Sequence, residues 1–170
     1  MKYGFVVLVA AALTMPAFGQ DPAGQQGMVG QGAWELSLSG SGSHDRDFDE
    51  GEFSITGDIG QYVTPEILLS LRQTVSYVSA GDDNFFASTR VAGDYHVDLG
   101  HNLVPFIGGN IGYVYGGRVR DTFAGGPEGG IKYYMRDDAF LFGRIEYQFF
   151  FRSNDLDDRF IYTVGAGFNF

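Results

Sequence analysis

From residue 33 onward, apolar and polar side chains alternate along the chain in a series of short segments. The last of them, Phe160 to Phe170, has apolar residues at even positions from Tyr162 onward and small or polar residues between them. Because a β-strand turns successive side chains to opposite faces, this pattern predicts a strand with one apolar face. Seven more segments repeat the alternation, at residues 33–42, 52–61, 66–77, 85–97, 103–115, 123–134 and 139–151. The pattern therefore predicts eight strands.

The connections between these segments alternate in length. Tight turns are predicted at residues 62–65, 98–102 and 135–138, whereas the longer and more acidic connections are residues 43–51, 78–84, 116–122 and 152–159. Short turns at one end and longer loops at the other are typical of outer-membrane barrels. An even number of strands would place both ends of the barrel wall on the short-turn side.

The first 32 residues lack this alternation. Residues 1–19 have the features of a secretory signal peptide, because Lys2 supplies a positive start, an apolar run follows, and Ala17 to Gly19 offer small residues before a cleavage site. Residues 20–32 are rich in Gly and Gln, and we interpret them as a flexible leader before a barrel domain at residues 33–170. After the signal, no apolar run is long enough for a transmembrane helix, so a membrane-spanning structure must be built from strands.

Composition excludes several classes of partner and covalent link. The chain contains no cysteine, which excludes disulfides and a lipoprotein anchor. Its formal net charge is −10, so nucleic acid is not expected as a partner, and anionic lipid would offer no electrostatic attraction.

Side-chain volume predicts which face of the strands points inward. Alternation also fits a soluble lipocalin-type barrel or a sandwich, both of which bury the apolar face. An eight-stranded barrel, however, encloses only enough space for side chains to fill. The apolar face is too bulky for that space, since it includes Trp34, Phe53, Tyr77, Tyr95, Ile111, Tyr113, Tyr147, Phe149, Phe151, Tyr162, Phe168 and Phe170.

We therefore predict an all-β fold, an eight-stranded antiparallel up-and-down transmembrane β-barrel with its apolar face toward lipid. Tyrosines near the strand ends suit the aromatic girdles at the two membrane interfaces. These are Tyr62, Tyr77, Tyr95, Tyr115, Tyr133 and Tyr147.

The segment Thr163 to Phe170 (TVGAGFNF) resembles the C-terminal assembly signal of the small outer-membrane β-barrel family, which includes outer-membrane proteins A, X and W and other porin-like barrels. Residues 104–116 and 126–151 are similar to paired strands of these barrels. The resemblance implies a location in the outer membrane of a Gram-negative envelope. It also implies that the outer-membrane assembly machinery reads Thr163, Gly165, Phe168 and Phe170. The sequence ends at Phe170 without a peptidoglycan-binding domain, so that role of outer-membrane protein A is not expected.

Charges of both signs occur on the face predicted to line the lumen. Charged groups withdrawn from water need partners, so we predict a salt-bridged plug. Its members are Glu35, Asp58, Arg72, Arg90, Asp94, Glu128, Lys132, Arg144 and Glu146, with His96 and Asn110 on the same face. Counting along the hairpins places Glu128 opposite Arg144, Arg90 beside Asn110 and Glu35 near Asp58. A gated pore or a proton-linked path through the same residues is the alternative.

Other candidate sites are weaker. Ser43, His44 and Asp45 are the residue types of a nucleophilic site, but three neighbours in a loop seldom converge. Acidic runs at residues 45–52, 82–83 and 155–158 offer carboxylates to divalent cations, yet they lack the ligand spacing of an EF-hand. We interpret these runs as solvated, and we expect His96 and His101 to be solvated or at the lumen rim. No catalytic residue, metal site or cofactor is predicted.

Three functions are compatible with these features, and fold alone does not choose among them. The preferred one is a monomeric, non-enzymatic outer-membrane protein with a structural or surface-interaction role, whose partners are outer-membrane lipid and the assembly machinery. The second is a narrow channel, or a conduit for small solutes or apolar molecules, and the third is a lipid-modifying enzyme. A filled lumen with paired charges favours the first. An apolar lumen with a lateral opening favours the second, and Ser and His on adjacent strand ends favour the third.

Overall fold

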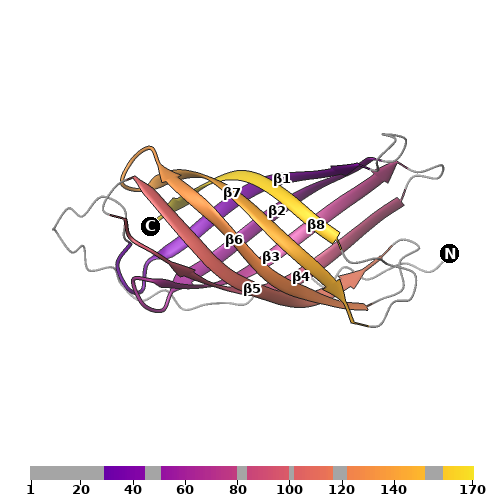
Figure 1. Cartoon of the computed structure of the whole chain (residues 1–170), viewed down its shortest axis with the longest axis horizontal. Helices are drawn as coiled ribbons and strands as arrows, with labels where there is room; N and C mark the ends of the chain where they lie inside the picture. The colour runs from indigo at the N-terminus through magenta and orange to yellow at the C-terminus, as the bar shows by residue number, and fades with distance from the viewer. Residues whose placement is uncertain (1–28, 45–50, 80–83, 100–101, 117–121, 152–158) are drawn as a thin grey trace.

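The computed structural model describes residues 29–44, 51–79, 84–99, 102–116, 122–151 and 159–170. They form eight strands: β1 (Trp34–His44), β2 (Gly51–Tyr62), β3 (Ile67–Ser79), β4 (Asn84–His96), β5 (Leu103–Tyr115), β6 (Thr122–Tyr134), β7 (Ala139–Phe150) and β8 (Arg159–Asn169). Each strand is antiparallel to the next, and β8 pairs with β1, so the sheet closes into a barrel (Figure 1). The predicted eight-stranded antiparallel fold is confirmed, with every strand within two residues of its predicted bounds.

The first and last strands close the barrel. Leu36 of β1 stands opposite Phe168 of β8, and beyond this pair Trp34 and Phe170 exchange backbone hydrogen bonds of 2.8 and 2.9 Å. Closure leaves no strand with an unpaired edge, which is the arrangement that lets a sheet exist without aggregating or exposing backbone polar groups. The C-terminus lies at the left end of the barrel in Figure 1.

The outer wall of the barrel is apolar. Val164, Ile107 and Leu38 expose 72, 66 and 63 % of their surface, and exposed apolar side chains recur on every strand. The alternation predicted from the sequence therefore sets the orientation of the strands. Trp34 is the exception, since it is only 9 % exposed, at the first residue of β1 beside a turn closed by a hydrogen bond from Ala33 to Gly30.

Aromatic rings fill the lumen at the short-turn end of the barrel, where the β2–β3, β4–β5 and β6–β7 connections lie. Val104, Tyr134, Phe140 and Phe142 form a buried cluster there. Tyr62, expected in an interfacial girdle, is 2 % exposed and points into the same end of the lumen. That expectation was wrong because Tyr62 shares the strand parity of Asp58, so its ring must face inward.

Several regions with sequence-based predictions lie outside the described residues. They include the signal peptide, the leader up to residue 28, residues 45–50, 82–83 and 155–158 of the acidic runs, and His101. Ser43 and His44 belong to β1, but their side chains are not described. Among the residues that are described, no helix is long and apolar enough to cross a membrane.

Candidate functional site

The nine charged side chains predicted to face the lumen are all buried inside the barrel. Their exposed fractions run from 1 % for Arg72 and Glu146 to 7 % for Asp58. They project from β1, β2, β3, β4, β6 and β7, from the strand face that otherwise carries small and polar residues. We call these nine residues the charge network: Glu35, Asp58, Arg72, Arg90, Asp94, Glu128, Lys132, Arg144 and Glu146.

Near the short-turn end of the barrel, Lys132 of β6 reaches across the lumen to Glu35 of β1. Its ammonium nitrogen lies 2.9 and 2.6 Å from the two carboxylate oxygens. The Tyr62 hydroxyl donates to Glu35 at 3.0 Å and accepts from Lys132 at 3.1 Å. Lys132 also lies 4.8 Å from the centroid of the Phe140 ring. The ammonium group is therefore held by a carboxylate, a hydroxyl and an aromatic face, which compensates for its loss of water.

Arg72 of β3 is the centre of the network. Its two terminal nitrogens donate to the carboxylate of Glu128 on β6 at 2.8 and 3.0 Å, and its Nε donates to Asp58 on β2. The amide of Asn110 adds a hydrogen bond of 2.5 Å to Glu128, and the Ser37 hydroxyl lies 3.3 Å from Asp58. A bidentate guanidinium–carboxylate pair combines charge with fixed geometry, so it holds opposite walls of the barrel in one arrangement.

A third pair continues the network toward the other end of the barrel. Arg90 of β4 donates to Glu146 of β7 at 2.5 Å and to the Thr74 hydroxyl at 3.3 Å. The other oxygen of Glu146 lies 4.0 Å from Arg72, which links this pair to the central one. The three cross-lumen contacts thus connect β1 to β6, β3 to β6 and β4 to β7.

Asp94 and Arg144 are the two network members that make no ion pair with the described part of the chain. Both are buried, at 5 and 6 % exposed, and Asp94 Oδ1 and Arg144 Nε lack hydrogen-bond partners there. Both line a small pocket within the charge network, which Glu35, Arg72 and Lys132 also line. Asp94 stands opposite Gly108, and its carboxylate packs so closely there that a Cβ on that residue would collide with it.

One predicted pairing across neighbouring strands is wrong, because Glu128 does not lie opposite Arg144. Arg144 stands opposite Gly130, and Glu128 opposite Glu146. The β6–β7 turn centres on Asp137 rather than Arg136, since Tyr134 pairs with Phe140 and Met135 donates to Ala139. This displaces the register by two residues and leaves every side chain on its predicted face.

The same two-residue displacement occurs in the β4–β5 hairpin. Arg90 stands opposite Gly112, and Asn110 opposite Ala92, so Arg90 and Asn110 lie beside each other as diagonal neighbours. Between β1 and β2, Asp58 stands opposite Ser37, one inward position from Glu35, so those two carboxylates are diagonal neighbours.

Of the two places expected for His96, solvent and the lumen rim, the first is wrong, since the residue is buried in the lumen at the last position of β4. It is 2 % exposed and lies between two rings, 5.5 Å from the centroid of Tyr62 and 5.4 Å from that of Phe106. The aromatic residues of this end of the lumen were missed in the sequence, although strand parity alone assigns Tyr62, Phe106 and Phe142 to the inward face.

The residues of the predicted assembly signal occupy both faces of β8. Thr163 is buried and Gly165 faces inward, whereas Phe168 and Phe170 are 46 and 44 % exposed on the outer wall, with ring centroids 5.6 Å apart. Within the described ranges, no group of three or more His, Cys, Asp or Glu side chains is placed to hold a metal ion.

No protein-family model matches this sequence, and neither does any curated protein. Solved structures do match. The N-terminal β-barrel domain of OprF from Pseudomonas aeruginosa gives a TM-score of 0.62 at 17 % identity, over 84 % of this chain and 100 % of that one. Neisserial surface protein A gives 0.61 at 15 % identity, over 84 and 97 % of the two chains. OprG from Pseudomonas aeruginosa gives 0.61 at 12 % identity, over 85 and 98 %. The chain thus has the fold of the eight-stranded outer-membrane β-barrels.

Proposed function

We propose that the protein is an integral outer-membrane β-barrel with a structural or surface-interaction role. A closed barrel satisfies its backbone hydrogen bonds between strands, which is the condition for spanning a bilayer without helices. The apolar outer wall suits contact with hydrocarbon, and Tyr95 and Tyr133, each about half exposed near the strand ends, suit the membrane interface. The fold shared with outer-membrane barrels supports the same location.

The ion-paired lumen is the observation that carries this role. Arg72 joins Asp58 on one wall to Glu128 on another, and Arg90 and Lys132 make further cross-lumen pairs on either side of it. A barrel closed by side chains in this way serves as a rigid anchor rather than as an open pore. We infer that it displays the four longer connections at the end opposite the short turns.

The C-terminal strand supports a route into the membrane. Phe168 and Phe170 present their rings on the outer wall of the strand that closes the barrel, where the assembly machinery could bind them. We infer a monomer, since closure leaves no strand edge for a second copy to extend. We also infer that the protein is not an enzyme and takes no cofactor.

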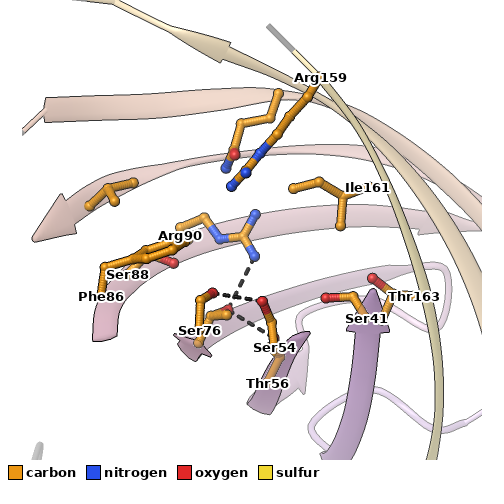
Figure 2. A pocket seen from close by; sticks show the side chains of 13 residues that line it. Ser41, Ser54, Thr56, Ser76, Phe86, Ser88, Arg90, Arg159, Ile161 and Thr163 are labelled. Atoms are coloured by element: carbon orange, nitrogen blue, oxygen red, sulfur yellow. Dashed lines mark hydrogen bonds between the residues drawn. The ribbon is translucent and has the colours of Figure 1, made fainter. Parts of the chain in front are cut away.

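A narrow conduit is the second candidate. One pocket, lined by Glu35, Arg72 and Lys132, lies within the charge network, and another, lined by Arg90, lies beyond it (Figure 2), so ion pairs interrupt the space inside the barrel. Exchange of ion-pair partners, for which Asp94 and Arg144 are placed, would be needed to open such a path. The charged lining suits small polar solutes and disfavours apolar molecules.

Fractionation of the envelope tests the proposed location. The full chain is expressed in a Gram-negative host, and membrane and soluble fractions are run on gels with and without boiling. We expect the protein in the outer-membrane fraction, with a mobility that changes on boiling because a folded barrel resists detergent. A soluble protein with the same mobility in both samples would refute the membrane location.

A further inference from the structure

Two polar side chains interrupt the apolar outer wall of the barrel. Apart from tyrosines and Gln61 beside the β2–β3 turn, the outward strand positions that the structure describes carry polar side chains only at Gln73 and Thr89. The two residues stand directly opposite each other, on β3 and β4. A polar group on a wall that faces hydrocarbon is costly unless it has a partner. Their occurrence as a facing pair therefore indicates a local role for this part of the wall.

Tyr115 of β5 joins these two residues in a closed ring of hydrogen bonds. The Thr89 hydroxyl donates to Gln73 Oε1 at 2.7 Å, and Gln73 Nε2 donates to the Tyr115 hydroxyl at 3.2 Å. The hydroxyl oxygens of Thr89 and Tyr115 lie 3.2 Å apart. Because the single hydroxyl hydrogen of Thr89 is engaged by Gln73, Tyr115 is the donor in this third contact. We call Gln73, Thr89 and Tyr115 the polar ring.

The polar ring has its donors engaged and its acceptors available. Gln73 Nε2 also donates to the backbone oxygen of Thr74 at 3.4 Å, so both amide hydrogens have acceptors. Gln73 Oε1 and the Thr89 oxygen each accept one hydrogen bond within the ring, and each can accept another. The ring can therefore bind a group that donates a hydrogen, and it offers no donor to a group that only accepts.

The polar ring lies between the middle of the outer wall and the longer connections. Gln73 is the seventh of the 13 residues of β3, and Tyr115 is the last residue of β5, at the end that leads into a longer connection. β3, β4 and β5 are neighbours in the sheet (Figure 1). In a membrane-spanning barrel this is the depth at which the head group of a lipid in the adjoining leaflet gives way to its acyl chains.

Space for a ligand adjoins the polar ring. The residue opposite Gln73 on β2 is Gly57, where a Cβ would meet no atom within 4 Å. Toward the short-turn end, a shallow apolar groove crosses β4 and β5, and Gly93 and Gly109 stand opposite each other in it. Exposed aliphatic side chains such as Ile111 border this groove. A polar spot that only accepts hydrogen bonds thus lies next to a surface suited to a hydrocarbon chain.

We propose that the polar ring and this groove bind one membrane lipid whose acyl linkage carries a hydroxyl or an amide N–H. That group donates to Gln73 Oε1 or to the Thr89 oxygen, while an acyl chain lies in the groove. A lipid with only ester linkages has acceptors alone at this depth, so it gains no hydrogen bond from the ring. The proposal rests on the proposed membrane location, because the ring is reached from the hydrocarbon side of the wall.

Two lipids with the same phosphocholine head group test the proposal. N-palmitoyl sphingomyelin carries an amide N–H and a hydroxyl near its chain linkage, whereas dipalmitoyl phosphatidylcholine carries two esters. Each lipid is titrated into the full chain folded in maltoside micelles, and native mass spectrometry counts the bound molecules. We expect one sphingomyelin to bind saturably, on the order of tenfold more tightly than phosphatidylcholine, as one hydrogen bond shielded from water implies.

The mobility of the same sample with and without boiling separates the two proposals. Equal binding of both lipids by a heat-modifiable barrel would overturn the lipid site and leave the membrane location intact. A chain whose mobility does not change on boiling would overturn the membrane location, and the lipid site with it.

Matched variants assign the lipid preference to the polar ring. The double variant Gln73→Leu and Thr89→Val removes both acceptors and makes this part of the wall apolar. Gln61→Leu makes the same change of residue type on the outer wall at the short-turn end, where Gln61 donates to the backbone oxygen of Gly32. We expect the double variant to bind the two lipids equally and Gln61→Leu to keep the preference of the wild-type protein. A preference that survives in the double variant, or that is lost equally in Gln61→Leu, would overturn the proposal.

Discussion

Arg72 and Glu128 face each other across the lumen from β3 and β6, strands that are not neighbours in the sheet, and two hydrogen bonds of 2.8 and 3.0 Å join them. Both side chains are almost completely buried, at 1 and 3 % exposed. Such a pair costs desolvation on both sides, so its value lies in the geometry that it imposes and in the penalty for breaking it. The opposite walls of the barrel are held together at this point.

Removing the charge of Glu128 should destabilise the barrel. In Glu128→Gln, Arg72 keeps Asp58 but loses its bidentate partner, and the loss of one partner of a buried pair costs about 3 kcal/mol. Urea unfolding in micelles, followed by the fluorescence of Trp34, the one tryptophan of the chain, measures the change.

Glu66→Gln provides the control for this variant, because Glu66 is a half-buried residue of the β2–β3 turn whose partner is Thr64. We expect it to cost less than about 1 kcal/mol. The variants Arg72→Met and Glu128→Gln should also be coupled, so that the double variant loses less stability than the sum. Equal losses in Glu128→Gln and Glu66→Gln would contradict the role assigned to the pair.

The Tyr62 hydroxyl should contribute to stability through its two charged partners. Tyr62→Phe removes the hydrogen bonds to Glu35 and from Lys132 and keeps the ring, which predicts a loss of about 1–2 kcal/mol. Tyr133→Phe is the matched control, since Tyr133 is 48 % exposed on the outer wall. The same urea titration applies, and a Tyr62→Phe variant as stable as Tyr133→Phe would show that the hydroxyl is dispensable.

Gly165 should be intolerant of a side chain. A Cβ there would lie 2.6 Å from a ring atom of Phe142 and 2.6 Å from the backbone oxygen of Leu38. We expect Gly165→Ala to destabilise the barrel by about 1–3 kcal/mol through overpacking. Gly143→Ala, on the neighbouring strand, meets no atom within 4 Å and should be neutral or slightly stabilising. Folding yield measured by heat-modifiable mobility distinguishes the two, and equal yields would refute the packing constraint.

The terminal phenylalanine should matter for assembly more than for the folded barrel. Phe170→Ala is compared with Phe151→Ala, because both rings are exposed on the outer wall, at 44 and 61 %. If the assembly machinery reads Phe170, the first variant lowers the amount of heat-modifiable protein in the outer membrane, and the second does not. Quantitative blotting of the outer-membrane fraction measures this amount, and an equal decrease in both variants would argue against a C-terminal signal.

Much of the fold could be predicted from the sequence because one physical constraint recurs along it. The period of two in segments such as Ala33 to Gly42 and Phe160 to Phe170 determines both where strands occur and which face is apolar. The space available inside eight strands then decides that the bulky face points outward. For the same reason all nine charged residues of the network were placed on the correct face.

The partners within the lumen could not be predicted in this way. Hairpin counting compares neighbouring strands, whereas Arg72 finds Glu128 across the barrel, at a height set by strand tilt and shear. The register also depends on turn geometry, and a turn centred on Asp137 instead of Arg136 moved Glu128 away from Arg144 by two residues. Inward aromatic residues such as Phe142 were overlooked because bulk was assigned to the outer wall, although parity places that ring inside.

Planar-bilayer conductance tests most directly whether the charge network closes the lumen. The wild-type protein, folded and inserted into a planar membrane, should produce no stepwise ion current at neutral pH, because Arg72, Arg90 and Lys132 are all engaged in ion pairs across the barrel. Glu128→Ala, which opens the central pair and removes side-chain volume, is the variant for comparison. Stepwise current through the wild-type protein would contradict the closed barrel and would favour the conduit instead.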